Sequence, residues 1–432
     1  MTTTVLKGGR LLDQQGERSG DVVVDDATAT IVAVGPDLSA DRTLDASGCH
    51  ITPGFVDLHV HLRQPGNEAA ETIGSGSRAA ARGGFTAVVA MPNTDPTMDS
   101  ASVINDVLTW SRGALCEVKP SAAITVGRAG TQLSPMGELV GLGVRLFTDD
   151  GTGVDDARMM RRALEYAGSL PTPDGEPVVL AQHCEVAALT EGASMHEGEW
   201  SARLGLGGQP AEAEELMVMR DIVLARLTGT RIHFQHLSTA GSVAMVRAAK
   251  AGGLPITAEA TPHHFTLTDA CCAGYDATFK VHPPLRTEHD VAAIKAGLAD
   301  GTIDAIATDH APHTPDAKER PFDQAPPGML GLETALGVAL TELDLPLAAV
   351  VALLSWRPAA IAGLGRSQGR PLTEGSAANL AVVDAGATWT VAGTALASRA
   401  RNTPFEGRTL RGRVRHTVYR GEPVVVDGEA TR

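Results

Sequence analysis

Two histidines and an arginine stand at alternate positions where an apolar run ends. His59, His61 and Arg63 belong to the stretch "FVDLHVHLRQPG", residues 55–66. Side chains of a strand alternate between its two faces, so these three can point the same way. Two imidazoles on one face fill a core poorly but make a good half of a metal site.

Further histidines and carboxylates end other apolar runs of the chain. Asp149 and Asp150 close "GVRLFTDDG", and Asp309 lies in "DAIATDHAPH". Nine of the 14 histidines also lie at run ends: His59, His61, His183, His233, His236, His263, His264, His310 and His313. One such histidine is usually structural, but so many at equivalent positions predict a metal site of the imidazole and carboxylate type that suits zinc.

Strand alternation groups these candidates into two metal sites. His59 and His61 share a face and can bind one ion, whose coordination Asp309 can complete. His183 and His236, from two later runs, can bind a second ion. Two such ions would lower the pKa of a bound water and polarise a carbonyl, while Asp309 moves a proton to a leaving nitrogen. The predicted chemistry is hydrolysis of an amide-like bond, or its reverse.

The remaining polar residues of these runs have weaker assignments. A carboxylate between the two ions could bridge them, and the residues alone leave Asp149 and Asp150 open. His233 lies an odd number of positions from His236, so alternation turns it away from the metals. His263 and His264 are adjacent and cannot both point inward, so we expect neither to be a ligand.

The elements that must position these residues read as a (β/α)8 barrel. Between residues 55 and 365, eight apolar strand-like runs alternate with helical patterns, such as 69–82, 155–167, 211–227 and 240–251. This alternation predicts parallel strands joined by helices. An open doubly wound sheet is the alternative, but no G-x-G-x-x-G follows the first run. Barrel active sites lie at the carboxyl ends of the strands, where the histidines and aspartates stand.

Both chain ends read differently from this middle. Short strand-like segments with turn residues fill the first 50 residues, and similar segments such as "ANLAVVDAG" and "RVRHTVYRGEPVVVDGE" fill the last part. Chain ends often lie close together. We therefore expect a small β-sandwich domain made of residues 1–52 and 366–432, with the barrel as a catalytic domain at 53–365.

Composition narrows the class of partner. The 432 residues are 43% hydrophobic and carry a formal net charge of −15, which argues against nucleic acid and anionic membranes. A small anionic substrate would need a local cation, and Arg63 is a candidate. The five cysteines include no CxxC, and the chain shows no signal peptide and no apolar run of about 18 residues. We expect a cytoplasmic protein without a membrane span.

These motifs resemble the dihydroorotases, within the amidohydrolase superfamily of metal-dependent barrels. The likeness covers nearly the whole chain and includes "PGFVDLHVHLRQPG", "AMPNTDP", "FTDDG", "AQHCE", "TPHH", "PPLR" and "IATDHAPH". The family interconverts N-carbamoyl-L-aspartate and L-dihydroorotate, a step of pyrimidine synthesis. The resemblance implies two zinc ions per chain, one on His59, His61 and Asp309 and the other on His183 and His236.

The resemblance also selects a bridge between the two ions. Hydantoinase-like relatives use a carboxylated lysine on the fourth strand, which "RLFTDDG" does not offer. The second aspartate resembles the bridge of the shorter bacterial dihydroorotases, so we assign Asp150 as the bridge and Asp149 as its support.

The family's substrate contacts map onto several further positions. Arg63, Asn93 and His313 would hold the substrate carboxylate, and Pro327 and Gly328 would make backbone contacts to the ring. The segment 313–328, "HTPDAKERPFDQAPPG", is expected to cover the site. One departure is His282 in "HPPLR", where the family has an asparagine that touches the ring.

Three other readings of the chain stay open at this point. One is a hydantoinase, dihydropyrimidinase or allantoinase, which Arg63 and the missing lysine argue against. Another is a non-catalytic homologue that scaffolds aspartate carbamoyltransferase, although no metal position has been lost. A metal-storage or structural barrel would leave Arg63 and Asp309 without a task. A homodimer and association with aspartate carbamoyltransferase are the expected protein partners.

Overall fold

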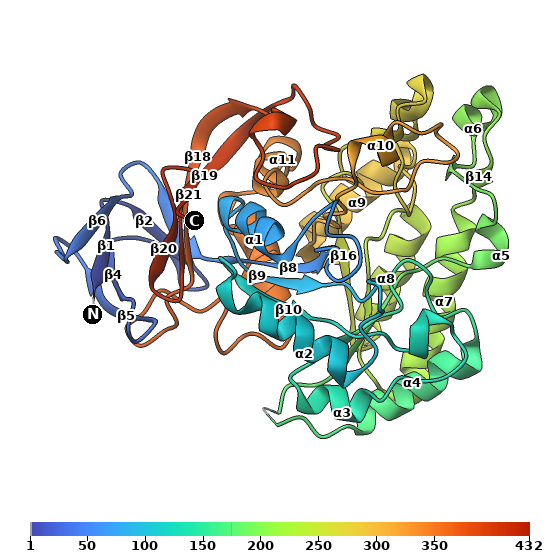
Figure 1. The fold of residues 1–432 in the computed structure, drawn as a ribbon, viewed down its shortest axis with the longest axis horizontal. Helices are drawn as coiled ribbons and strands as arrows, with labels where there is room; N and C mark the ends of the chain where they lie inside the picture. The colour runs from blue at the N-terminus through green and yellow to red at the C-terminus, as the bar shows by residue number, and fades with distance from the viewer. Residues whose placement is uncertain (1, 174) are drawn as a thin grey trace.

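Eight parallel strands form the centre of the protein in a computed structural model, which describes residues 2–173 and 175–432 (Figure 1). In chain order they are β8 (Phe55–Val60), β9 (Phe85–Ala90), β10 (Glu117–Pro120), β11 (Leu146–Phe147), β12 (Val179–Gln182), β15 (Ile232–Phe234), β16 (Ile256–Ala260) and β17 (Ala305–Ile306). Each begins within or beside one of the eight apolar runs of the sequence. Buried β-branched and small side chains fill them, as expected for parallel strands covered on both faces.

These strands close on themselves. Ladders join β8, β9 and β10 in one group and β11, β12, β15, β16 and β17 in another. Parallel bridges connect the two groups at both seams, from Ala122 to Phe147 and from Val60 to His310. Backbone hydrogen bonds support the second seam, where His61 N donates to His310 O over 2.8 Å. The predicted (β/α)8 barrel is therefore confirmed.

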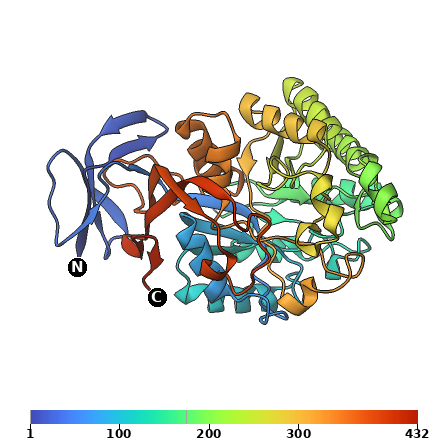
Figure 2. The same cartoon turned by 90° about the horizontal axis from the view of Figure 1, so that it is seen from above.

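Helices surround the barrel strands (Figure 2). The principal ones are α1 (Ile73–Arg82), α2 (Ala101–Trp110), α3 (Met136–Gly141), α4 (Ala157–Ser169), α7 (Glu212–Thr228), α8 (Ala240–Ala251), α9 (Glu288–Asp300), α11 (Ala335–Glu342), α12 (Leu347–Leu354) and α13 (Trp356–Ile361). Three further helices are α5 (Ala187–Thr190), α6 (Glu199–Leu204) and α10 (Pro315–Lys318). The helix expected at 69–82 begins only at Ile73, because Thr72 and Ser75 form a capping box.

A second, sheet-rich part lies beside the barrel and combines both chain ends (Figure 1). Its strands are β1 (Thr3–Lys7), β2 (Arg10–Asp13), β3 (Gly16–Ser19), β4 (Asp21–Asp25), β5 (Thr30–Gly35), β6 (Arg42–Asp45), β7 (His50–Pro53), β18 (Leu380–Thr390), β19 (Thr409–Tyr419), β20 (Glu422–Val426) and β21 (Glu429–Ala430). One sheet has the order β5-β4-β1-β6 and the other β21-β20-β19-β18-β7-β2-β3.

The two chain ends meet where β7 pairs antiparallel with β18, with Ile51 opposite Val382. Leu6, Leu11, Val22, Ile51 and Val382 belong to one apolar cluster between the sheets. This cluster is separate from the main barrel core. The exact boundaries, 1–52 with 366–432 against 53–365, stay a prediction.

Candidate metal centre and active site

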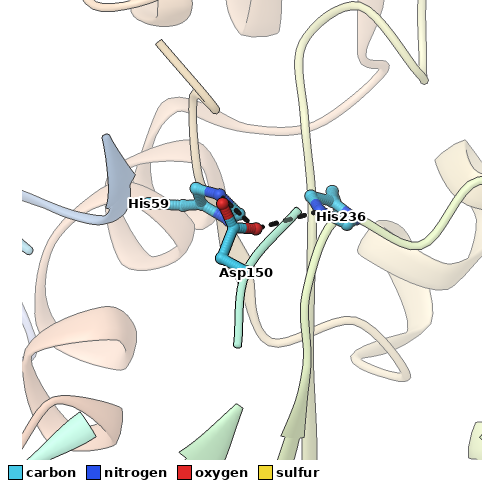
Figure 3. A group of neighbouring side chains, drawn as sticks. All are labelled: His59, Asp150 and His236. Carbon is cyan, nitrogen blue, oxygen red and sulfur yellow. Dashed lines mark ion pairs between the residues drawn. The ribbon is translucent and has the colours of Figure 1, made fainter. Parts of the chain in front are cut away.

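Three predicted ligands from distant strands meet at the carboxyl end of the barrel. His59 lies near the end of β8, Asp150 follows β11, and His236 follows β15 (Figure 3). His59 Nε2 is 3.2 Å from Asp150 Oδ1, and His236 Nε2 is 3.8 Å from the same oxygen. One ligand atom from each residue lies within 4.8 Å of the others, close enough to hold one cation.

A second group shares His59 with the first. His61 Nε2 lies 3.0 Å from Asp309 Oδ1, and His59 Nε2 lies 3.6 Å from that oxygen. Ligand atoms of His59, His61 and Asp309 also fall within 4.8 Å of one another. This is the set that the sequence predicts for one ion.

His183 joins the cluster from the end of β12. Its Nδ1 lies 2.9 Å from His236 Nε2 and 3.5 Å from Asp150 Oδ1. The structure thus brings together all six residues predicted to bind metal: His59, His61, Asp150, His183, His236 and Asp309.

The two adjacent aspartates take different positions. Asp150 faces His59, His183 and His236. Asp149 points elsewhere, because its carboxylate accepts hydrogen bonds from the Thr125 backbone N–H, over 3.0 Å, and from the Thr125 hydroxyl. This geometry favours Asp150 over Asp149 as a bridge.

Glu259, in β16, orients two of the imidazoles and was missed by the sequence analysis. Glu259 Oε1 lies 3.0 Å from His59 Nδ1, and Oε2 lies 3.0 Å from His233 Nε2. Burial alone would raise the pKa of Glu259, but the opposite effect of these two histidines is larger, and the pKa is lowered to about 2. The available signal was a lone carboxylate inside the apolar run "PITAEATPHH".

The donor set fits a divalent cation. When the His59 ring is neutral and donates Nδ1–H to Glu259, as it would with a cation bound, its lone pair is on Nε2, which is buried and makes no hydrogen bond. This nitrogen faces Asp150 and Asp309, so a cation there would meet nitrogen and oxygen donors together. A carboxylate behind a ligating histidine is a usual arrangement at metal sites.

The electrostatics of the cluster favour a cation too. Burial raises the pKa of Asp150, but nearby His59, His183 and His236 hold it well below its usual range. The pKa of Asp309 is also lowered, with His61 as the strongest opposing influence to burial. Two ionised carboxylates therefore share a buried site.

Three of the site residues have left-handed backbone conformations. The φ angles are 59° at Arg63, 29° at His236 and 47° at Asp309. Residues other than glycine adopt such angles at a cost, and they persist where the surrounding structure holds them. This backbone geometry aims side chains in directions that strand alternation alone does not predict.

A cavity of about 320 Å³ opens beside the cluster. Its walls include every predicted substrate residue: Arg63, Asn93, His282, His313, Pro327 and Gly328. Arg63 Nε donates to Pro312 O over 3.1 Å, and its Nη2 lies 3.3 Å from His313 Nε2. Burial lowers the pKa of Arg63 to about 10, which leaves it charged at neutral pH.

Asn93 is more closely engaged with the metal cluster than expected. Its Oδ1 lies 2.9 Å from His61 Nδ1, and its Nδ2 donates to Asp150 Oδ2 over 3.0 Å. Arg128, which the sequence analysis did not select, lines the same cavity and donates from Nη1 to Asp150 O over 2.6 Å.

The pair after β16, His263 and His264, is buried, His282 is partly buried, and all three imidazoles have lowered pKa values. Burial lowers the pKa of His282 to about 4, so the ring is neutral, and its Nε2 makes no hydrogen bond. His264 lies 2.8 Å from Thr261 Oγ1 and 3.0 Å from Pro283 O, so it is engaged away from the cluster. Burial lowers the pKa of His263 to about 4.

Family models match the chain in two overlapping parts. The model described as dihydro-orotase-like matches residues 48–242, and the amidohydrolase family model matches residues 208–424. Two proteins named dihydroorotase are close in sequence. The one from Streptomyces coelicolor is 48% identical, covering 100% of both chains, and the one from Mycobacterium tuberculosis is 50% identical, covering 96% of both.

Solved structures of related enzymes share the fold. L-hydantoinase (dihydropyrimidinase) from Arthrobacter aurescens superposes with a TM-score of 0.88 at 23% identity, covering 100% of this chain and 98% of that one. D-hydantoinase from Thermus sp. gives a TM-score of 0.84 at 25% identity, with 99% and 96% covered. The sequence relatives are nearly full-length and twice as similar, so the chain belongs to the dihydroorotases, a family of metal-dependent amidohydrolases.

Proposed function

We propose that this enzyme interconverts N-carbamoyl-L-aspartate and L-dihydroorotate, as a step of pyrimidine synthesis. The observation that carries the proposal is one cavity holding both a buried histidine–aspartate cluster and the cation Arg63. A cyclic amide that also bears a carboxylate matches both features. Arginine offers a planar pair of donors that suits a carboxylate, and His313 beside it extends this grip.

The cofactor we propose is a pair of zinc ions. His59, His61 and Asp309 would hold one ion, His183 and His236 the other, and Asp150 would bridge them. Such ions activate water at neutral pH and polarise the carbonyl that is attacked.

The chain's own residues supply binding and proton transfer. Arg63, Asn93 and His313 bind the carboxylate, the backbone of Pro327 and Gly328 contacts the ring, and His282 borders it. In hydrolysis, water attacks the ring amide carbonyl while the Asp309 carboxylate accepts its proton. Asp309 then gives this proton to the ring nitrogen as the carbon–nitrogen bond breaks. Cyclisation runs through the same steps in reverse.

The rival activity is hydrolysis of neutral cyclic ureides by a hydantoinase, dihydropyrimidinase or allantoinase. The likeness to solved hydantoinases supports a shared fold. Arg63 has no carboxylate to bind in a neutral ureide, and the stretch 145–150 contains no lysine. These features favour dihydroorotate.

The experiment is conversion of L-dihydroorotate by the purified protein, followed by ultraviolet absorbance, with zinc measured on the same sample. We expect turnover with about two zinc ions per chain, the count that two complete sites require. Metal-loaded protein that opens dihydrouracil but not dihydroorotate would contradict the proposal. Metal-loaded protein inactive on both would favour the scaffold reading.

We also propose a cytoplasmic location and a homodimer. The five cysteines are all unpaired, as is usual in a reducing compartment. No helix among the described residues is long and apolar enough to span a membrane. An exposed apolar stripe on α7, made of Leu216, Met219, Val223 and Leu227, supports self-association. Association with aspartate carbamoyltransferase is the other role that we consider for this stripe.

A further inference from the structure

A segment of the sheet-rich part reaches the active site. Residues 396–403 lie between β18 and β19, far along the chain from every residue of the proposed metal site. Two of its polar side chains, Ser398 and Asn402, are buried and contact the barrel. Ser398 donates from its hydroxyl to Glu71, a fully buried carboxylate that also lies 3.4 Å from His310 Nε2. The segment is therefore anchored to the barrel beside β17.

Asn402 uses its whole amide on the backbone that lines the substrate cavity. Its Nδ2 donates to Ala311 O and to Gly328 O, both over 3.1 Å. Its Oδ1 accepts from His313 N over 3.2 Å. One side chain thus joins residues 311–313, after β17, to Gly328. The two stretches are separate in sequence and lie side by side in the wall of the cavity.

The backbone that Asn402 holds also holds the proposed carboxylate site. Pro312, between the two residues bonded to Asn402, accepts the hydrogen bond from Arg63 Nε over 3.1 Å. His313 Nε2 in turn lies 2.8 Å from Pro327 O. The orientations of Arg63 and His313 therefore both depend on a backbone that Asn402 ties in place.

The backbone at Gly328 lies very close to residues 311–313. Its φ is 140°, a conformation that favours glycine, and a Cβ there would lie 2.7 Å from Ala311 Cβ and 2.8 Å from His313 Nε2. At such short distances, a small shift of residues 311–313 would also displace Gly328 and so change the shape of the cavity wall.

We propose that Asn402 is a positioning residue for substrate binding, supplied to the barrel by the sheet-rich part. It acts through Pro312, His313 and Gly328 and does not touch the substrate itself. This inference rests on the proposed function, because it assigns Asn402 to the carboxylate side of that cavity. Asn402 makes no hydrogen bond to the proton-transfer residue Asp309 or to the histidine cluster. We therefore expect proton transfer and metal binding to continue when Asn402 is replaced.

The test is Asn402→Asp in the full-length, zinc-loaded enzyme. The aspartate keeps the acceptor for His313 N but replaces both donors with an oxygen that faces two carbonyl oxygens. We expect KM for L-dihydroorotate to rise by about tenfold or more, because Arg63 and His313 would lose the backbone that orients them toward the substrate carboxylate. We expect kcat to stay within about threefold and zinc content to be unchanged, because binding is altered and chemistry is not.

Asn379→Asp is the matched control. Asn379 is also buried, donates from Nδ2 to Ser367 O over 2.8 Å, and accepts from Arg420 N over 2.8 Å, all outside the active site. Loss of stability alone should therefore appear in both variants, and a raised KM only in Asn402→Asp. Asn402→Ala removes all three side-chain hydrogen bonds, to Ala311 O, Gly328 O and His313 N, without adding a charge, and it serves if the aspartate variant does not fold.

The outcomes separate the inference from the proposed function. Wild-type turnover of dihydroorotate tests the function and does not depend on Asn402. An unchanged KM in a folded Asn402 variant, or equal changes in the Asn402 and Asn379 variants, would overturn the positioning role. A raised KM with normal zinc content and near-normal kcat supports it.

Discussion

At the scale of single residues, Asp309 is the group with the most specific proposed task. Its ionised carboxylate lies 3.0 Å from His61 Nε2 and beside the cavity, so it can accept a proton and return it. We expect Asp309→Asn to keep most of the zinc and to lower kcat by about 10²–10⁴, the usual contribution of general acid–base catalysis. Steady-state rates and zinc content of one preparation check this. Asp344→Asn, in an exposed position after α11, is the control, and a near-normal rate for Asp309→Asn would remove Asp309 from proton transfer.

Glu259 carries a second prediction at this scale. Its two carboxylate oxygens accept from His59 and His233 separately, whereas a glutamine has only one acceptor oxygen. Glu259→Gln should leave one imidazole without its orienting partner and weaken zinc binding by about 10–100-fold. Zinc retained against a competing chelator measures this, with the exposed Glu197→Gln as the control. Equal retention in both variants would show that Glu259 does not support the site.

At the scale of elements, the order and kind of the barrel strands could be predicted from sequence, because alternating strand and helix patterns are local signals. The placement of polar residues at strand ends then brought the histidines and aspartates into one region. Glu259 and Asn402 could not be found in that way. Glu259 acts from inside a strand, and Asn402 acts from a segment that only the packing of the sheet-rich part brings to the barrel.

Asp149 and Asp150 are a clearer example of what residue patterns cannot predict. Both follow β11, and alternation separates them without saying which one faces the metals. The hydrogen bond from Thr125 N to Asp149, which comes from a different loop, favours Asp150 as the residue that faces the metals. Such a choice needs tertiary contacts, so residue patterns alone left it open.

Glu333 lies just before α11 and contacts the segment around residue 397. We expect the stability of this contact to depend on pH. Burial raises the pKa of Glu333 from 4.5 to about 7, although Arg82 lies 3.5 Å away and Ala397 N donates to it. The folded chain therefore keeps this proton to higher pH than the unfolded chain. The free energy of unfolding should fall as pH rises from about 4.5 to about 7 and change little from this group above that range.

Glu333→Gln should remove this fall in stability. The variant should match the wild type near pH 5 and exceed it at pH 8 by roughly 1–3 kcal/mol. Melting temperatures of both proteins at the two pH values measure the difference, with the exposed Glu374→Gln as control. A stability difference that is the same at pH 5 and pH 8 would mean that Glu333 does not titrate in this range.

At the scale of the whole molecule, exposed apolar side chains gather on one side of the barrel. Leu216, Met219, Val223 and Leu227 are between 45% and 60% exposed and recur at helical spacing along one face of α7. Clustered exposed apolar residues on a folded protein mark a site of association more often than scattered ones do. This stripe is the surface on which we base the proposed homodimer.

The charges at the two ends of α7 suit a second copy of the same helix. The first turn contains Glu212 and Glu215, and the last turn contains Arg226. Two α7 helices packed antiparallel about a twofold axis would place each acidic end against the partner's basic end, with the apolar stripes between them. The same interface would thereby bury the apolar residues and pair the charged residues of α7.

Val223→Glu tests this arrangement by placing a carboxylate in the middle of the stripe, against its own counterpart across the twofold axis. We expect the wild type to have twice the 44.8 kDa mass of one chain in sedimentation equilibrium, and the variant to have the mass of one. Val32→Glu alters a similarly exposed valine on β5 and should leave the dimer intact. A wild type that stays monomeric, or a Val223→Glu variant that stays dimeric, would show that α7 does not form the interface. A monomeric wild type would direct the next experiment to aspartate carbamoyltransferase as the occupant of the stripe.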